Sequence, residues 1–303
     1  MPINFFKHIA NPDDDSVIKF TPSDDLKEFV EGYYVFNANY CDGRQLFFND
    51  GYPVVAFMQT KNEKAKISID GQIKWVGNTW VCGGILKNIY CESSIPFENF
   101  LIIRFYPMTF FKLFGIGDDY FEKAQVFDFS EIAGYGFEMF NEAYYSSFSI
   151  EKRIQVITSF LSEKIDCYSY PKVLIDILDY INRQGVLTVK DLLETYTVRL
   201  NYKWLERNFK KHLGISPKNY LLIRRFLNAY LDLHSFRSKD LLQIAINNGY
   251  YDDNHFIKDF RRFSGVPPKT YFQNIAASSR CCNCEDILPT VNGPVYTNSR
   301  RDY

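Results

Sequence analysis

The chain has 303 residues, enough for two domains of ordinary size, and its apolar content is sufficient for a substantial core. Its net charge of −1 argues against a uniformly basic nucleic-acid binder. The charge is unevenly distributed, however, because residues 171–275 carry 17 Lys and Arg against 10 Asp and Glu, whereas the rest of the chain carries 18 against 26. This asymmetry is typical of a DNA-facing module joined to a part with another task.

No segment of the sequence has the pattern of a membrane span or an export signal. No apolar run approaches the roughly 18 residues that span a bilayer. The first residues lack a basic segment followed by a long apolar one. The seven cysteines are odd in number and mostly scattered, which favours reduced thiols. We therefore expect a cytoplasmic protein without a membrane partner.

Residues 1–130 are predicted to form a β-rich domain that serves as a sensor or as a dimerisation module. Asp70 and Gly71 separate two segments that alternate in period two, as in a hairpin. Residues 24–36 fit either a covering helix or a segment that runs into a strand. Several short strands with turns between them predict a sandwich or barrel. The clearest strands are predicted at residues 52–58, 64–69, 72–76 and 98–105.

Helical periodicity replaces the β pattern after Pro107, where a short helix is predicted. Residues 131–170 are predicted to be a helical connector that contains an amphipathic helix at 150–165 and ends in a linker at 166–170. Residues 276–303 show no periodicity, so we expect a disordered tail.

One segment of the chain is repeated, with substitutions, 51 positions later. Residues 205–220 read LERNFKKHLGISPKNY, and residues 256–271 read FIKDFRRFSGVPPKTY. Each copy has an apolar pair four residues apart, basic residues on the other side, and a Gly that ends the helix. A shorter apolar helix is predicted ahead of each copy, at 187–196 and 238–249. A short helix, a turn and a second amphipathic helix make a helix-turn-helix, whose second helix lies in the DNA major groove.

Residues 171–275 resemble the DNA-binding domain of the AraC/XylS-type transcription regulators. The resemblance implies two helix-turn-helix units joined by one long helix, here residues 216–234. Departures from the family pattern are Leu193, the additional residues Arg199–Leu200, Asp253 and Ile257. The matching positions of the second unit are Ala245, Gly249, Tyr250, Phe256, Phe260, Gly265 and Pro268.

The arrangement of residues 1–130 also resembles the N-terminal β domain of some of these regulators, with Phe105, Tyr106 and Pro107 ahead of a short helix. We therefore expect an α+β fold, in which a mostly-β sandwich or barrel-like domain precedes an all-α domain with two helix-turn-helix units. The resemblance implies a sequence-specific transcription regulator, more often an activator than a repressor, with double-stranded DNA and RNA polymerase as partners. A small-molecule effector and a homodimer both stay open for the N-terminal domain.

The first recognition helix carries Lys203, Glu206, Arg207 and Lys210 at positions i, i+3, i+4 and i+7. On an isolated helix such a face is ordinarily just solvated, but inside the duplicated unit we expect it to contact DNA. Arg207 suits a bidentate contact with guanine, and Lys203 suits a base or a phosphate. Glu206 could accept a hydrogen bond from cytosine, or disfavour binding in a wrong register on the DNA. Leu205 and Phe209 lie on the opposite, inner face.

The equivalent face of the second recognition helix consists of Asn254, Ile257, Lys258 and Arg261. Asn254 suits adenine, whereas Lys258 and Arg261 suit phosphate. Ile257 can touch only a thymine methyl group, so this helix is expected to contribute less base readout. Asp252 and Asp253 are expected to be N-terminal caps. Of the histidines, His255 is expected to pack inward, and His212 and His234 to face solvent.

The sequence offers two further classes of function. Cys281, Cys282 and Cys284 give the tail a C-x-x-C spacing that would suit a metal or redox sensor, but a structural zinc site needs four ligands and no second pair lies nearby. A small-molecule-processing N-terminal domain would need metal ligands or a nucleophile beside a histidine, and His8 is the only histidine before residue 171. We therefore expect no catalytic residues, no metal site and no cofactor.

Overall fold

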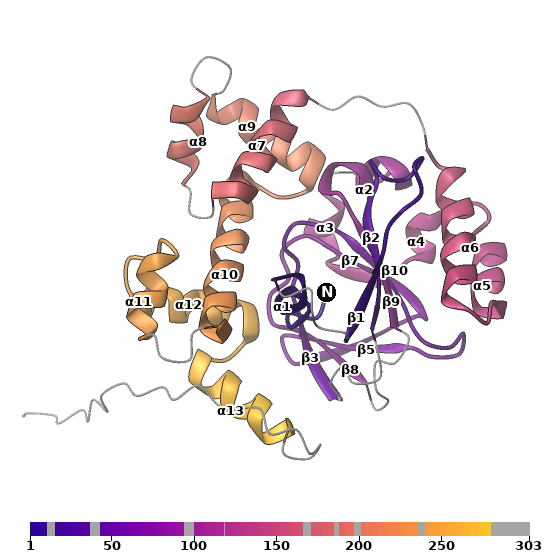
Figure 1. Cartoon of the computed structure of the whole chain (residues 1–303), viewed down its shortest axis with the longest axis horizontal. Helices are drawn as coiled ribbons and strands as arrows, with labels where there is room; N and C mark the ends of the chain where they lie inside the picture. The colour runs from indigo at the N-terminus through magenta and orange to yellow at the C-terminus, as the bar shows by residue number, and fades with distance from the viewer. Residues whose placement is uncertain are drawn as a thin grey trace, which may run out of the picture.

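The structure of the chain, a computed structural model, describes residues 1–10, 16–36, 43–93, 100–117, 119–165, 171–184, 188–196, 201–235 and 240–279. Strands occupy the centre of Figure 1 and one group of helices lies on each side of them. We call residues 1–128 the β region and residues 171–279 the C-terminal region. The predicted linker at 166–170 lies outside the described residues.

Six antiparallel strands form the larger sheet. In β4 and β9 every residue is buried, because both faces of this sheet are covered. Phe100 and Ile102 of β9 belong to one hydrophobic cluster, whereas Leu101 and Ile103 belong to another on the opposite face. In spatial order the strands are β1 (Val17–Phe20), β2 (Val30–Phe36), β9 (Phe100–Phe105), β4 (Val54–Phe57), β7 (Thr79–Cys82) and β10 (Val126–Asp128).

Four antiparallel strands form the smaller sheet, in the order β3 (Gly43–Phe47), β8 (Ile89–Ser93), β5 (Ala65–Ile69) and β6 (Gln72–Val76). The predicted hairpin is confirmed, because Ile69 pairs with Gln72 and the turn residues Asp70 and Gly71 have φ values of 49° and 83°. Phe47 of this sheet packs against Trp80 of the larger one, with ring centroids 5.3 Å apart. The two sheets thus form the predicted sandwich.

Helices cover the other face of the larger sheet. They are α2 (Pro107–Phe114), α3 (Tyr120–Lys123), α4 (Ser130–Ala133), α5 (Phe137–Ser146) and α6 (Ile150–Ser162). Tyr144 of α5 lies with its ring 4.4 Å from that of Phe57 in β4. The aromatic side chains between these helices and the sheet are packed against one another in the core.

One segment that the sequence left ambiguous is resolved. Residues 24–29 are turns, and the strand β2 begins at Val30, so the helical alternative for 24–36 is wrong. The reason is tertiary, since Tyr33 and Tyr34 are buried on opposite faces of the larger sheet and belong to different clusters.

The C-terminal region is entirely helical in its described part. Its helices are α7 (Lys172–Gln184), α8 (Val189–Thr195), α9 (Tyr202–Leu213), α10 (Pro217–Ser235), α11 (Leu241–Asn247), α12 (Asp253–Ser264) and α13 (Pro268–Ser279). The predicted long helix is confirmed as α10. Helix α13 continues to Ser279, so the prediction of a disordered tail is wrong for residues 276–279, and residues 280–303 lie outside the described residues. None of the described helices is both long and apolar enough to span a bilayer. A short helix, α1 (Phe5–Ala10), lies near α10 and the smaller sheet in Figure 1.

Candidate nucleic-acid interface

The first helix-turn-helix unit consists of α8 and α9. A capping box starts α8, because Thr188 and Asp191 exchange hydrogen bonds between side chain and backbone. The side chain of Asn201 accepts a hydrogen bond from the backbone N–H of Trp204 at 2.9 Å and so starts α9. Gly214 ends the helix with a φ of 67°, a left-handed conformation that glycine adopts most readily. The additional residues Arg199–Leu200 in the turn lie outside the described residues.

The second unit, α11 and α12, repeats this design. The Asp252 side chain accepts a hydrogen bond from the backbone N–H of His255 at 2.7 Å, so the predicted cap is confirmed for Asp252, while Asp253 is the first residue of the helix. Gly265 ends α12 with a φ of 78°. The duplicated sequence therefore produces two recognition helices with matching ends.

The inner faces of the two recognition helices are apolar and completely buried. Leu205 and Phe209 of α9 are 0% exposed, as are their counterparts Phe256 and Phe260 of α12. The ring of Phe209 packs against Tyr220 with centroids 5.7 Å apart. Burial of these side chains fixes the rotation of each helix about its axis, and thereby decides which residues point outward.

The outer faces carry the residues that are predicted from the sequence to contact DNA. Lys203, Arg207 and Lys210 are exposed on α9, and Asn254, Lys258 and Arg261 are exposed on α12. Glu206 and Ile257, at equivalent positions, are partly buried. Glu206 lies 3.3 Å from the Lys210 ammonium and forms an i,i+4 ion pair with it. Each predicted set of four thus shares one face of one helix.

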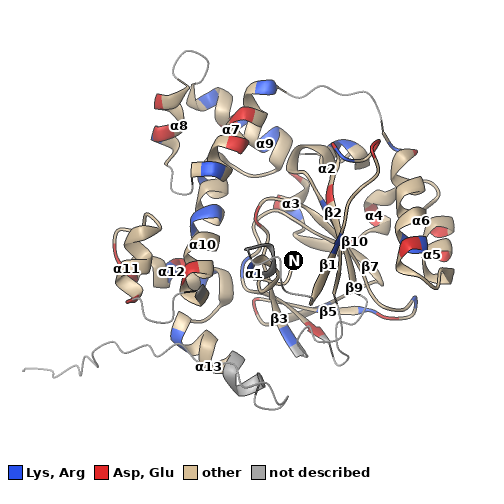
Figure 2. Cartoon of the chain, in the orientation of Figure 1, with Lys and Arg blue, Asp and Glu red and all other residues tan. Residues whose placement is uncertain are grey.

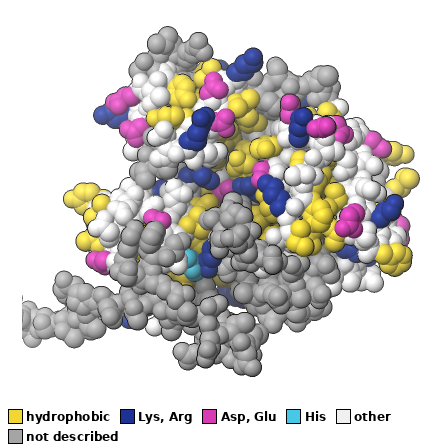
Figure 3. Space-filling model, in the orientation of Figure 1, with side chains coloured by type: hydrophobic (Ala, Val, Ile, Leu, Met, Phe, Trp, Pro, Cys, Tyr) yellow, Lys and Arg dark blue, Asp and Glu magenta, His cyan; other side chains and the backbone are white. Residues whose placement is uncertain are grey.

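Helix α10 joins the two units, because α8, α9, α11 and α12 all contact it. Lys and Arg positions mark α9 and successive turns of α10 in Figure 2. On the face seen in Figure 3, basic and acidic side chains are interspersed over α7 and α8.

The expectations for the histidines are corrected. His255 is exposed rather than packed, although its ring lies 5.2 Å from that of Tyr250. His212 is buried, and burial followed by the charge of Lys211 lowers its pKa. His234 is only partly accessible, because the rings of Tyr230 and Phe272 enclose its imidazole. Helical periodicity alone could not predict how buried these imidazoles are, because residues on neighbouring helices surround them.

One structural group was missed by sequence reasoning. Arg225 of α10 lies 3.4 Å from the carboxylate of Asp259 in α12 and stacks over the ring of Tyr250 at 4.4 Å. Asp259 precedes the buried Phe260 and occupies the place of Asn208 in the first copy. A carboxylate on the buried side of an amphipathic helix requires a partner, which is the signal that could have revealed this contact.

Known proteins match the C-terminal region by sequence. Residues 178–274 match a family described as a helix-turn-helix domain. The HTH-type transcriptional regulator GbdR of Pseudomonas aeruginosa is 34% identical over 79 residues, which are 26% of this chain and 21% of GbdR. The HTH-type transcriptional activator RhaS of Escherichia fergusonii is 36% identical over 81 residues, 26% of this chain and 28% of RhaS. The C-terminal region is an AraC/XylS-type helix-turn-helix domain.

The match to these relatives is confined to this domain, and it spans only about a quarter of the length of either regulator. Among solved structures, the match to ToxT from Vibrio cholerae O395 covers 84% of this chain and 95% of the ToxT chain, at 13% identity and a TM-score of 0.39. The AraC-like transcriptional activator CuxR covers 76% of this chain at a TM-score of 0.22. The identification of the AraC/XylS-type domain rests on the sequence matches, not on these structures.

Proposed function

We propose that the protein is a transcription regulator that binds a specific site on double-stranded DNA. The observation that carries this proposal is the pair of matched recognition helices on α10, each with a buried apolar face and an exposed basic or polar face. Two such helices on one connecting helix would enter successive major grooves, about 34–36 Å apart.

Each exposed residue has a proposed task. Arg207 forms a bidentate contact with guanine, and Asn254 forms one with adenine. Lys203, Lys258 and Arg261 contact phosphates, which positions the domain on the duplex without reading sequence. Lys210 and Glu206 share one ion pair, so their contact with DNA requires that this exposed pair opens, at a cost of about 1 kcal/mol or less. Ile257 contributes an apolar contact alone.

The role of the β region and the sign of regulation belong to this proposal. Activation through contact with RNA polymerase is supported by the family resemblance and by the relative RhaS, which is a transcriptional activator. For the β region we propose a sensor of a small molecule or a dimerisation module. A thermal-shift screen of the full chain against small metabolites tests the first role, because a ligand that binds only the folded state raises stability. Sedimentation tests the second.

DNA titrations of the full chain test the proposed function. The expected result is binding to the DNA upstream of its own coding region, with an affinity that falls steeply with salt because phosphate contacts release counterions. Lys258→Ala is expected to lower the salt slope by about one. Lys27→Ala, at an exposed lysine of the β region, is the matched control and should leave the slope unchanged. Fluorescence anisotropy that stays flat at low salt contradicts the proposal.

A metal or redox sensor in the tail is the alternative function. Cys281, Cys282 and Cys284 lie outside the described residues, and no cluster of potential metal ligands is found among those that the structure describes. Deletion of residues 280–303 is expected to leave DNA binding intact. Stoichiometric zinc that is lost with this deletion would favour the alternative.

A further inference from the structure

The β region caps the C-terminal end of the second recognition helix. The last carbonyl groups of an α-helix have no partner within the helix. In α12 the carbonyl of Phe263 accepts a hydrogen bond from the backbone N–H of Asn88 at 2.7 Å. The carbonyl of Ser264 accepts a hydrogen bond from the phenol of Tyr90 at 2.6 Å. Two donors at the start of β8 thus complete a helix of the helix-turn-helix domain.

Asn88 is held in place by the hairpin of the smaller sheet. Its φ of 51° is left-handed, a conformation that asparagine tolerates better than most residues. The Asn88 carbonyl accepts a hydrogen bond from the backbone N–H of Asp70 at 3.2 Å, and its side-chain amide donates one to the Asp70 carboxylate at 3.1 Å. The donor to α12 is therefore preorganised by the turn between β5 and β6.

Aromatic packing reinforces the two caps. Phe48, which follows β3, packs against both Phe226 of α10 and Phe263 of α12, with ring centroids 5.3 Å and 5.5 Å away, and these two rings also contact each other at 4.5 Å. Phe48 is 1% exposed, so this contact is fully dehydrated. Contacts between aromatic rings in such geometries are worth about 0.5–1.5 kcal/mol beyond the area they bury.

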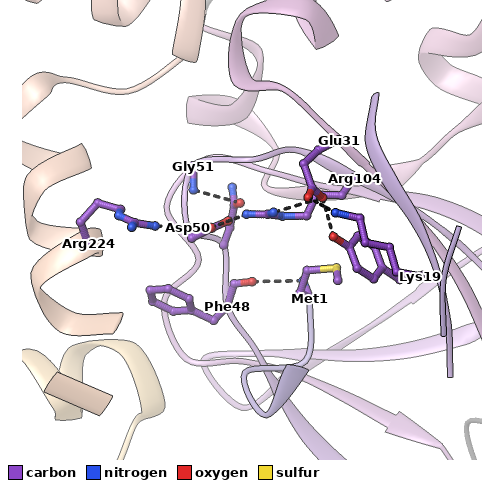
Figure 4. A network of polar contacts seen from close by, with 10 residues as sticks. Met1, Lys19, Glu31, Phe48, Asp50, Gly51, Arg104 and Arg224 are labelled. Atoms are coloured by element: carbon purple, nitrogen blue, oxygen red, sulfur yellow. Dashed lines mark hydrogen bonds and ion pairs between the residues drawn. The ribbon is translucent and has the colours of Figure 1, made fainter. Parts of the chain in front are cut away.

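A charge network joins the β region to the middle of α10, as Figure 4 shows. Asp50 pairs with Arg104 of β9 and lies 3.8 Å from the guanidinium of Arg224 in α10. Arg104 also lies 3.3 Å from Glu31. One oxygen of Asp50 and the Nε atom of Arg224 are buried without a hydrogen-bond partner in the described part of the chain. Because a partly satisfied buried network contributes little net stability, we expect Phe48 and the two caps to hold α12 more strongly than this network does.

The docked β region leaves the predicted DNA face of α12 uncovered. Asn254, Lys258 and Arg261 are exposed although Phe263 and Ser264 are buried against the β region. The β region therefore holds the end and the inner side of α12 and does not obstruct its outer face. These contacts between the β region and α12 therefore fix the direction in which the outer face of α12 points.

We infer that Tyr90, Asn88 and Phe48 are positioning residues for DNA recognition by α12, so that the β region sets how the second unit reads its half-site. This inference rests on the proposed DNA-binding function. Loss of these contacts affects the half-site read by α12 more than the one read by α9, because α9 packs at the N-terminal end of α10 and contacts the β region through a different element, α2.

The variant Tyr90→Phe tests this inference in the full chain, because it removes one hydroxyl group and keeps the ring. Tyr33→Phe is the matched control, since the Tyr33 phenol is bonded to Thr158 at 3.4 Å, within the N-terminal half of the chain. Amide hydrogen exchange of residues 253–264 is measured without DNA. The expected result is exchange about threefold to tenfold faster in Tyr90→Phe than in the wild type or in the control, as loss of one buried hydrogen bond implies.

DNA titrations form the second arm. The probe is a duplex selected from random sequence by the wild-type chain, and the half-site of α12 is the one whose base preference relaxes in Asn254→Ala. Mutation of this half-site in the duplex weakens DNA binding by a certain factor. In Tyr90→Phe this factor is expected to be about threefold to tenfold smaller than in the wild type, whereas the factor for the other half-site is expected to be unchanged.

The outcomes separate the inference from the proposed function. Unchanged exchange in α12, or an equal loss at both half-sites, overturns the inference. A wild-type chain that binds no DNA overturns the proposed function and the DNA part of the inference with it. The exchange measurement needs no DNA and decides by itself whether the β region caps α12.

Discussion

Gly265, which ends the second recognition helix, lies directly against the side chain of Asn88 in the β region. Its φ of 78° is left-handed, and a Cβ atom built on it would overlap the amide oxygen of Asn88. Glycine is thus required at this position for two reasons: the left-handed helix end and the close contact between the two regions.

Gly265→Ala is therefore expected to destabilise the chain by more than the backbone strain alone. Gly71→Ala is the matched control, because Gly71 has a φ of 83° and no atom within 4 Å of its Cβ position. The left-handed conformation costs a residue with a Cβ atom about 1–2 kcal/mol, which both variants share. Urea unfolding should show an additional loss in Gly265→Ala. Equal losses in both variants would contradict the contact with Asn88.

Arg207→Ala is expected to weaken DNA binding by about 1–3 kcal/mol and to relax the preference at one base position. Arg207 is exposed on α9, one turn from the exposed Lys203. Lys258→Ala should instead weaken all sequences to a similar degree, because a phosphate contact carries no sequence information. Titrations with specific and random duplexes distinguish the two. Equal weakening of both duplexes by Arg207→Ala would remove this residue from base readout.

Phe209→Ala is expected to lower the free energy of unfolding by about 3–5 kcal/mol, through lost burial and the cavity that remains. Phe209 is 0% exposed, and Phe260, its counterpart, is expected to respond similarly. Lys210→Ala, at the neighbouring exposed position, should change stability by less than about 0.5 kcal/mol and yet reduce DNA affinity. Urea melts and DNA titrations of these variants provide the test. A stability-neutral Phe209→Ala would refute the assigned helix orientation.

The stability of the chain is expected to fall at mildly acid pH because of His234. Burial, followed by the charge of Lys7, lowers the pKa of His234 from 6.5 to about 2, and its Nε2 atom has no hydrogen-bond partner in the described part of the chain. Below pH 6.5 the unfolded chain binds a proton that the folded chain does not, so the free energy of unfolding decreases with falling pH. At pH 5 the decrease amounts to about 1–2 kcal/mol.

The control for this pH effect is a comparison of two substitutions. His234→Gln should reduce the difference between urea melts at pH 7 and pH 5, whereas His255→Gln, at an exposed imidazole, should not. His212 contributes in the same direction as His234, because burial also lowers its pKa. An identical pH dependence in His234→Gln and the wild type would show that this imidazole is not responsible.

The sequence by itself determined the local design of the recognition helices. Their apolar spacing fixes which face is buried, and the glycines at 214 and 265 fix where they end. Both signals act within a few residues, so they are readable without knowledge of the fold. The hairpin at Asp70 and Gly71 was predictable for the same reason. The tasks assigned to Arg207 and its neighbours stay predictions.

Only the tertiary structure decided how distant segments use these elements. Residues 30–36 form a strand because side chains on both faces of the larger sheet are buried, in two different clusters, which no local pattern records. The buried environment of His234 and the partner of Asp259 depend on α10 and α13 packing against their neighbours. The bond from Tyr90 to Ser264 joins residues 174 positions apart. A contact over such a separation forms only when complete secondary-structure elements pack together. A single hydroxyl group does not change the hydrophobic periodicity of the sequence, so the sequence could not predict this bond.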